Sequence, residues 1–246
     1  MARRCVFAFV IYLAAVRVAG ADSILVYDDN TVHQLALQAA LSTPGAVVVR
    51  ADSSTFGTLL RSQTWDLVLA DMPSTLPTAG GMSALADYVN AGGKAAMSFW
   101  TWQTEGAVSS AFGVRPQHDI SLAGATLFDF GASSVFDGVT MPNGGWHDHW
   151  SDDGDVFALT RGGTFLAGLG SRSAPVMALT NGGRTIAAPL FDEAGGTWLS
   201  DGSGRRLWSN MIGALRAPTP TPVPEPATMA LVGLGIGVVA ARKRTR

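Results

Sequence analysis

The densest group of chemically capable side chains lies in residues 146–155. This segment holds two of the four histidines of the chain, His147 and His149, together with four carboxylates. In an extended segment, histidines at positions i and i+2 project to the same side, so this pair could share a metal ion. A third ligand would have to come from elsewhere in the chain. The candidates are Asp28, Asp29 and Asp192.

The same segment also has the composition of a solvated acidic turn. Asp152, Asp153 and Asp155 surround Gly154, and aspartate and glycine are common turn residues. The spacing matches neither the helical His-Glu-x-x-His zinc motif nor the Asp-x-Asp-x-Asp-Gly calcium loop. A turn without a specific metal is therefore favoured over a metal site, and the sequence identifies no other cofactor.

Short apolar runs alternate with helical stretches in the first half of the chain, and these elements must position the polar residues. Strands are expected at residues 24–27, 46–49, 67–70 and 95–99, and helices at 32–41, 56–61 and 82–90, with Thr31 as an N-cap and Gly92 and Gly93 at a C-cap. This alternation predicts an α/β domain with a flavodoxin-like parallel sheet and helices on both faces.

The second half of the chain predicts a β-rich extension of this sheet. Strand-like segments occur at residues 126–130, 156–160, 165–167, 176–179 and 185–190, and an amphipathic helix is expected at 205–215. Glycine-rich turns separate several of them. We expect the short strands to form a mixed or antiparallel extension, with the last strand and helix rejoining the main sheet.

Polar and aromatic residues follow the expected strands, at the end of a parallel sheet where ligands usually bind. An acidic cleft flanked by aromatic rings is therefore expected on one rim. Its candidate residues are Asp28, Asp29, Asp71, Trp100, Trp102 and Asp192. The alternatives are that the aspartates cap helices or form turns, which is favoured for Asp71, and that the tryptophans close the core, which is favoured over stacking on a sugar.

The pattern of strands 65–70 and 181–190 and helices 84–93 and 208–215 resembles the class I glutamine amidotransferase-like fold. Catalytic members place a cysteine on a sharp turn after a central strand. The corresponding turn, residues 98–103, instead contains bulky aromatic side chains. Its hydroxyl residues, Ser98 and Thr101, lack the Gly-x-Ser-x-Gly context of a nucleophile. Amidotransferase chemistry is therefore not expected.

Composition excludes several further functions. Residues 22–216 carry ten Lys or Arg and eighteen Asp or Glu, so this part has a net charge of −8, although the whole chain is at −2. Nucleic acid is an unsuitable partner for such a charge because phosphate binding needs clustered cations. The one cysteine, Cys5, lies in a segment expected to be removed, which leaves no thiol for disulfides, metal sites or catalysis.

The N-terminus has the order of a secretory signal peptide. Arg3 and Arg4 precede an apolar run at residues 6–16, and small residues follow at 19–21. Cleavage after Ala21 would start the mature chain at Asp22, and residues 22–216 are expected to form the α/β domain.

The C-terminus contains three unlike features in a fixed order. After a Thr/Pro linker at residues 217–222 come Pro224, Glu225 and Pro226, then an apolar stretch at 227–241, and then four basic residues. Residues 223–246 resemble a PEP-CTERM sorting signal, which implies processing by an exosortase. The apolar stretch would form a transmembrane helix of about 22 Å, short of the roughly 30 Å hydrocarbon core, and the basic end would place the domain on the outer face.

Two functions remain open from these features. The favoured one is an exported, membrane- or surface-anchored domain of the envelope or extracellular matrix, non-catalytic, with a polysaccharide or small molecule as its ligand. The alternative is an extracytoplasmic, metal-assisted hydrolase acting on a carbohydrate or ester, with His147 and His149 as ligands or bases.

Overall fold

The computed structural model describes most of the predicted α/β domain. The described residues are 22–30, 32–78, 80–121, 126–141, 154–170, 174–193, 196–197 and 201–217. They form one compact unit that ends at Arg216. His147 and His149, Thr31, the predicted signal peptide and the PEP-CTERM segment lie outside the described residues.

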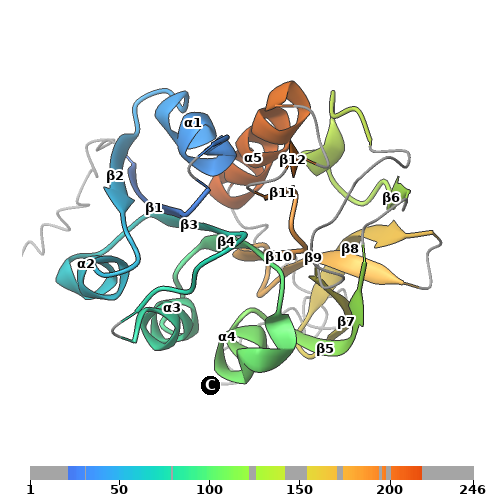
Figure 1. Ribbon diagram of the computed structural model, residues 1–246, viewed down its shortest axis with the longest axis horizontal. Helices are drawn as coiled ribbons and strands as arrows, with labels where there is room; N and C mark the ends of the chain where they lie inside the picture. The colour runs from blue at the N-terminus through green and yellow to red at the C-terminus, as the bar shows by residue number, and fades with distance from the viewer. Residues whose placement is uncertain are drawn as a thin grey trace, which may run out of the picture. The chain divides into compact units, whose positions relative to one another are not determined.

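An eight-stranded sheet forms the centre of the domain, in the order β2-β1-β3-β4-β10-β9-β8-β6 (Figure 1). Five strands run parallel: β1 (Ser23–Asp28), β2 (Val47–Ala51), β3 (Leu67–Met72), β4 (Ala95–Phe99) and β10 (Thr185–Ala188). Three antiparallel strands extend the sheet: β9 (Pro175–Thr180), β8 (Gly163–Leu169) and β6 (Leu127–Asp129). The predicted parallel core, antiparallel extension and return of the last strand are thus confirmed.

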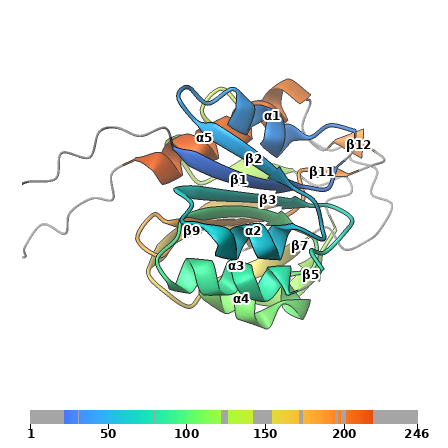
Figure 2. The same cartoon turned by 90° about the vertical axis from the view of Figure 1, so that its left-hand side faces the viewer.

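Helices cover both faces of the sheet (Figures 1 and 2). One face carries α1 (Leu35–Leu41) and α5 (Asp201–Arg216), and the other carries α2 (Phe56–Ser62), α3 (Gly81–Asn90) and α4 (Gly106–Ala111). Because side chains alternate along a strand, each buried strand supplies both cores. In β1, Ile24 and Val26 pack under α1 and α5, whereas Leu25 and Tyr27 face the other core.

Several elements differ from the sequence-based expectation. Helix α1 begins at Leu35 rather than at residue 32, and Gln34 before it has φ 49°. The strand β7 (Gly154–Leu159) pairs with β5 (Val114–Ile120) in a separate two-stranded sheet. The sequence pattern missed β5, because this strand has mostly exposed polar side chains and contains Pro116. It also missed α4. Short elements complete the description: the 3-10 turns η1 (Trp102–Thr104) and η2 (Ser134–Phe136), and the paired strands β11 (Asp192–Glu193) and β12 (Gly196–Thr197).

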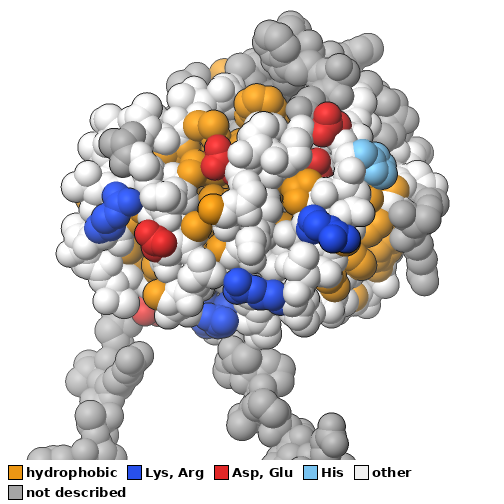
Figure 3. Space-filling model, turned by 90° about the horizontal axis from the view of Figure 1, so that it is seen from below, with side chains coloured by type: hydrophobic (Ala, Val, Ile, Leu, Met, Phe, Trp, Pro, Cys, Tyr) orange, Lys and Arg blue, Asp and Glu red, His pale blue; other side chains and the backbone are white. Residues whose placement is uncertain are grey.

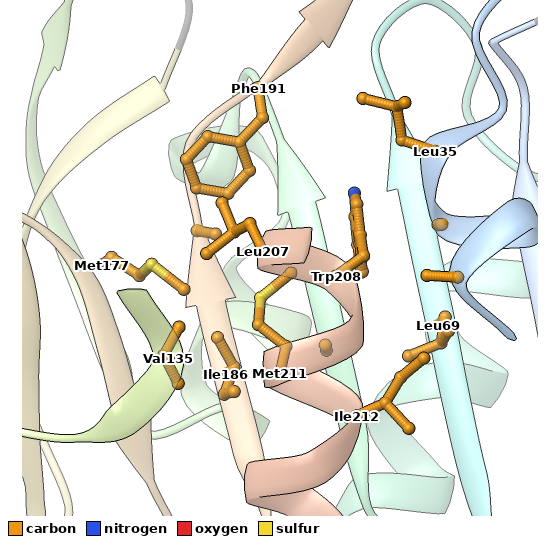
Figure 4. Close-up of a cluster of buried hydrophobic side chains, with 14 of the residues drawn as sticks. Leu35, Leu69, Val135, Met177, Ile186, Phe191, Leu207, Trp208, Met211 and Ile212 are labelled. Carbon is orange, nitrogen blue, oxygen red and sulfur yellow. The ribbon is translucent and has the colours of Figure 1, made fainter. Parts of the chain in front are cut away.

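Helix α5 begins four residues earlier than predicted and packs closely on α1. A Cβ added at Gly204 would lie 2.4 Å from Leu35 Cδ1, so glycine permits the contact between these helices. Figure 4 shows Leu207, Trp208, Met211 and Ile212 of α5 in the core beneath.

The two ends of the described domain meet at the amino edge of the sheet. Arg216, the last residue of α5, forms an ion pair with Asp22, 2.5 Å between Nη2 and Oδ2. Asp22 immediately precedes β1, and its carbonyl accepts a hydrogen bond from Val47 N at 2.8 Å. The chain therefore enters and leaves this domain at neighbouring points.

No helix among the described residues is long and apolar enough to cross a membrane. The predicted transmembrane stretch, residues 227–241, lies outside that part of the chain.

Candidate functional site

An open cleft of about 410 Å³ lies where β1, β2 and β3 end. It is lined by Tyr27, Asp28 and Asp29 at the end of β1, by residues 50–53 at the end of β2, and by Thr75 after β3. The sequence predicted a cleft at this rim, and the structure brings Asp28 and Asp29 to it. The sequence did not single out Tyr27 or Arg50, which lie inside a strand and at a strand end.

Two hydrogen bonds hold the loop after β3 against the end of β1. The Tyr27 hydroxyl donates to Thr75 O at 2.8 Å, and Thr75 N donates to Asp29 Oδ2. The Tyr27 ring is itself buried against Phe56, 5.2 Å between ring centroids. Burial, together with the nearby charge of Asp29, raises the pKa of Tyr27 above its ordinary value, so the phenol stays a neutral donor.

Asp28 acts as a capping residue for the segment that leads into α1. Its Oδ2 accepts from Leu37 N at 3.1 Å, and its Oδ1 accepts from Asn30 N at 3.2 Å. The side chain is 2% exposed, and burial raises the pKa of Asp28 to about 6 against the lowering effect of these two bonds. The capping alternative therefore describes the contacts of Asp28.

The two carboxylate oxygens of Asp29 have different surroundings. Its Oδ2 is bonded to Thr75 N, whereas Oδ1 is buried and has no hydrogen-bond partner in the part of the chain that the structure describes. Burial raises the pKa of Asp29 to about 6. At neutral pH the group is thus mostly ionised.

Asp52 and Arg50 complete the charge of the cleft. The side-chain hydroxyls of Ser54 and Thr55 donate to Asp52 and lower its pKa to about 2, so this exposed carboxylate stays ionised. Three carboxylates then face one guanidinium, a net charge of about −2 at neutral pH. Such a site disfavours anionic ligands.

A metal site is not formed by the described residues, since they contain no group of three His, Cys, Asp or Glu side chains placed to hold an ion. The predicted ligands His147 and His149 lie outside the described residues. Asp192 lies in β11, where only the backbone is described.

Asp71 differs from the favoured expectation of a cap or turn. It lies inside β3, is fully buried, and is in register with Asp28 on β1 and with Ser98 on β4. The strand continues through Asp71 because both neighbouring strands pair with it there. The residue therefore faces α1 and α5 rather than the cleft.

The two predicted aromatic residues after β4 have different environments. Trp102 is fully buried, and its Nε1 donates to Ala188 O at 3.0 Å while its backbone N donates to Asp155 Oδ2 at 2.9 Å. Trp100 is half-buried with its ring 6.0 Å from that of Phe99. Trp102 thus fits the core alternative and presents no stacking surface. The sequence analysis placed Asp155 in an acidic turn and did not predict that its buried carboxylate would accept a hydrogen bond from Trp102 N.

Charged side chains are spread over the face of the domain that carries α2, α3 and α4. Figure 3 shows this face with acidic and basic side chains of the described residues scattered among uncharged ones. A surface of this kind does not produce the concentrated field that steers a highly charged polymer.

Comparison with known proteins identifies the tail and the fold. Residues 222–244 match the PEP-CTERM protein-sorting motif, which marks an exported protein processed by an exosortase. No curated protein sequence matches the chain significantly.

Solved structures resemble the α/β domain at low sequence identity. A candidate GMP synthase component from Thermoplasma acidophilum is 14% identical with a TM-score of 0.51, over 79% of this chain and 94% of that one. A ThuA-like protein from Parabacteroides merdae is 12% identical with a TM-score of 0.46, over 83% and 93% of the two chains. The first similarity agrees with the amidotransferase-like fold expected from the sequence.

Proposed function

We propose that this exported, exosortase-processed chain is a surface-anchored protein whose α/β domain binds neutral sugar units of an envelope or matrix polysaccharide without catalysing a reaction. The tail motif supports the location, because it marks export and processing at the cell envelope. The rim cleft supports the ligand. Its volume of about 410 Å³ lies in the lower part of the roughly 300–1,000 Å³ range of small-molecule sites.

The observation that carries the proposal is the unused carboxylate oxygen of Asp29. A buried acceptor is normally satisfied, and because Asp29 lines the cleft, a small shift of its carboxylate would present Oδ1 to a ligand hydroxyl. Arg50, on the neighbouring strand end, supplies guanidinium donors for other sugar oxygens. The net negative charge argues against uronic acids, phosphates and sulfates as the bound units.

The turn after β4 supports a non-catalytic role. Ser98 and Thr101 are buried at 0% and 3% exposure, and Trp102 after them is fully buried. A nucleophile must be accessible to its substrate, so these hydroxyls are poorly placed for attack.

Calorimetric titration of the purified protein with a neutral glucan and with polygalacturonate tests the proposal. We expect saturable binding of the glucan alone, weakened at least about tenfold by Asp29→Asn, because a hydrogen bond to a charged group is lost. Asp87→Asn, an exposed carboxylate on α3 outside the cleft, is the matched control and should bind as the wild type does. Equal affinities of the two variants, or tighter binding of polygalacturonate, would refute the assignment.

A further inference from the structure

A second depression, of about 230 Å³, lies where α1 and α5 run side by side (Figure 1). It shares no lining residue with the rim cleft. Among the described residues its lining combines guanidinium, hydroxyl and amide groups and includes no carboxylate. The lining residues are Gln38 and Ala39 of α1, Ser42 at the end of that helix, and Gly202, Arg205, Arg206 and Ser209 of α5.

Helical spacing produces the α5 side of this depression. Arg205, Arg206 and Ser209 follow Gly202 by three, four and seven positions, so all four residues lie on one face of the helix. The apolar residues of α5 occupy the other face and pack in the core, which directs both arginines outward. A Cβ added at Gly202 would meet nothing within 4 Å, so the depression is open at this end.

The donors of this face are available to a ligand. Arg206 and Ser209 are exposed, and neither side chain forms a hydrogen bond or ion pair with the residues that the structure describes. Arg205 already has an interaction within the protein, and a guanidinium has several N–H groups, so one partner does not use all its donors. The cationic side of the depression therefore combines two positive charges with a hydroxyl group.

The α1 side offers groups that suit the uncharged part of a ligand. Gln38 Nε2 donates to His33 O at 2.7 Å, and its second N–H remains for another acceptor. The Ser42 hydroxyl donates to Gln38 O at 2.8 Å, so its oxygen remains as an acceptor. One donor and one acceptor match the hydroxyl groups of a small polyol or sugar.

The charge and the donors together select a phosphate monoester. Such a group carries a charge of about −1.5 to −2 at neutral pH and three acceptor oxygens. Arginine side chains pair with phosphate oxygens through two parallel N–H bonds. A carboxylate carries a single negative charge and two oxygens, so it matches two guanidiniums and a hydroxyl less well, and a metal cation would be repelled.

We propose that this depression binds a phosphate monoester on a small hydroxyl-bearing carbon skeleton. Arg205, Arg206 and Ser209 hold the phosphate, and Gln38 and Ser42 contact the hydroxyl groups. A volume of about 230 Å³ lies below the roughly 300–1,000 Å³ range of drug-sized ligands, so the site suits a single small unit. The negative charge of the whole domain acts weakly here, because exposed charges more than about 8 Å apart are screened at physiological salt.

Calorimetric titration of the purified full-length protein with glycerol phosphate tests the proposal. We expect saturable binding, weakened at least about tenfold by Arg206→Gln, because a hydrogen bond between charged groups is lost. Arg115→Gln removes an exposed arginine of β5 outside the depression and should bind as the wild type does. Both variants should bind glucan equally, so a failure of the phosphate site is distinguishable from a failure of the sugar cleft.

Two further ligands identify the chemical class and its source. Galacturonate should bind at least about tenfold more weakly than glycerol phosphate, because its carboxylate carries less charge. Phosphatidylcholine vesicles containing phosphatidic acid present the same monoester on a lipid. Binding of glycerol phosphate identifies a soluble ester, whereas Arg206-dependent binding to these vesicles alone identifies a headgroup. No Arg206-dependent binding of either ligand, or galacturonate bound as tightly as glycerol phosphate, would overturn the proposal.

Discussion

Asp28 should make the domain more stable in mild acid than at neutral pH. Burial raises its pKa from 3.8 to about 6 in the folded protein. The folded state therefore binds a proton in the window between these values, whereas the unfolded chain does not. The sign follows: this contribution to stability is fully present below pH 3.8 and is lost as the pH rises through about 6.

The magnitude follows from the two pKa values. The full difference between 3.8 and about 6 corresponds to at most about 3 kcal/mol. Integrating over the titration, about 1 kcal/mol of this develops between about pH 7 and about pH 5. Solvent screening needs little allowance, because the side chain is 2% exposed.

Comparing the wild type with Asp28→Asn measures the pH-dependent contribution of Asp28 to the free energy of unfolding. Asparagine does not titrate, and its one carbonyl can replace only one of the bonds to Leu37 N and Asn30 N, which gives a pH-independent offset. Urea unfolding at several pH values should show the difference between the two proteins grow in favour of the wild type by about 1 kcal/mol from about pH 7 to about pH 5. A flat difference, or one of opposite slope, would refute the raised pKa and the desolvated environment behind it.

Three further outcomes are expected. Gly204→Ala should destabilise the domain relative to Gly213→Ala by about 1–3 kcal/mol in thermal unfolding, because only the first added Cβ meets Leu35; equal effects would contradict the close contact of α1 and α5. Tyr27→Phe should lower the free energy of unfolding by about 1 kcal/mol and weaken glucan binding, because the hydrogen bond to Thr75 O that shapes the cleft is lost. Unchanged binding would show that this hydrogen bond does not contribute to the ligand site. Intact mass of protein extracted from its own cells should show loss of the segment after Pro226, and recovery of chains ending at Arg246 would argue against processing.

The sequence predicted the parallel strands because each contains a short apolar run, and all of them except β2 are buried on both faces. β1 and β3 have almost no exposed residue, and such runs are typical of strands covered by helices. The rim position of Asp28 and Asp29 followed from the same logic, since polar residues after these runs must lie at the carboxyl edge.

Other features depend on tertiary pairing and could not be predicted from local pattern. Asp71 resembles a turn residue in sequence, yet neighbouring strands on both sides keep it inside β3. The first turn of α5 contains Gly202 and Gly204, which disfavour helix, and the approach to Leu35 explains the second of them. Asp155 is surrounded by turn residues in sequence, and only the fold shows its bond to Trp102 N.

The ion pair between Asp22 and Arg216 bears on how the domain would sit on a tether. Both residues lie at the amino edge of the sheet, whereas the cleft lies at the carboxyl edge, across the full length of the strands. The chain therefore leaves the domain on the side opposite the cleft.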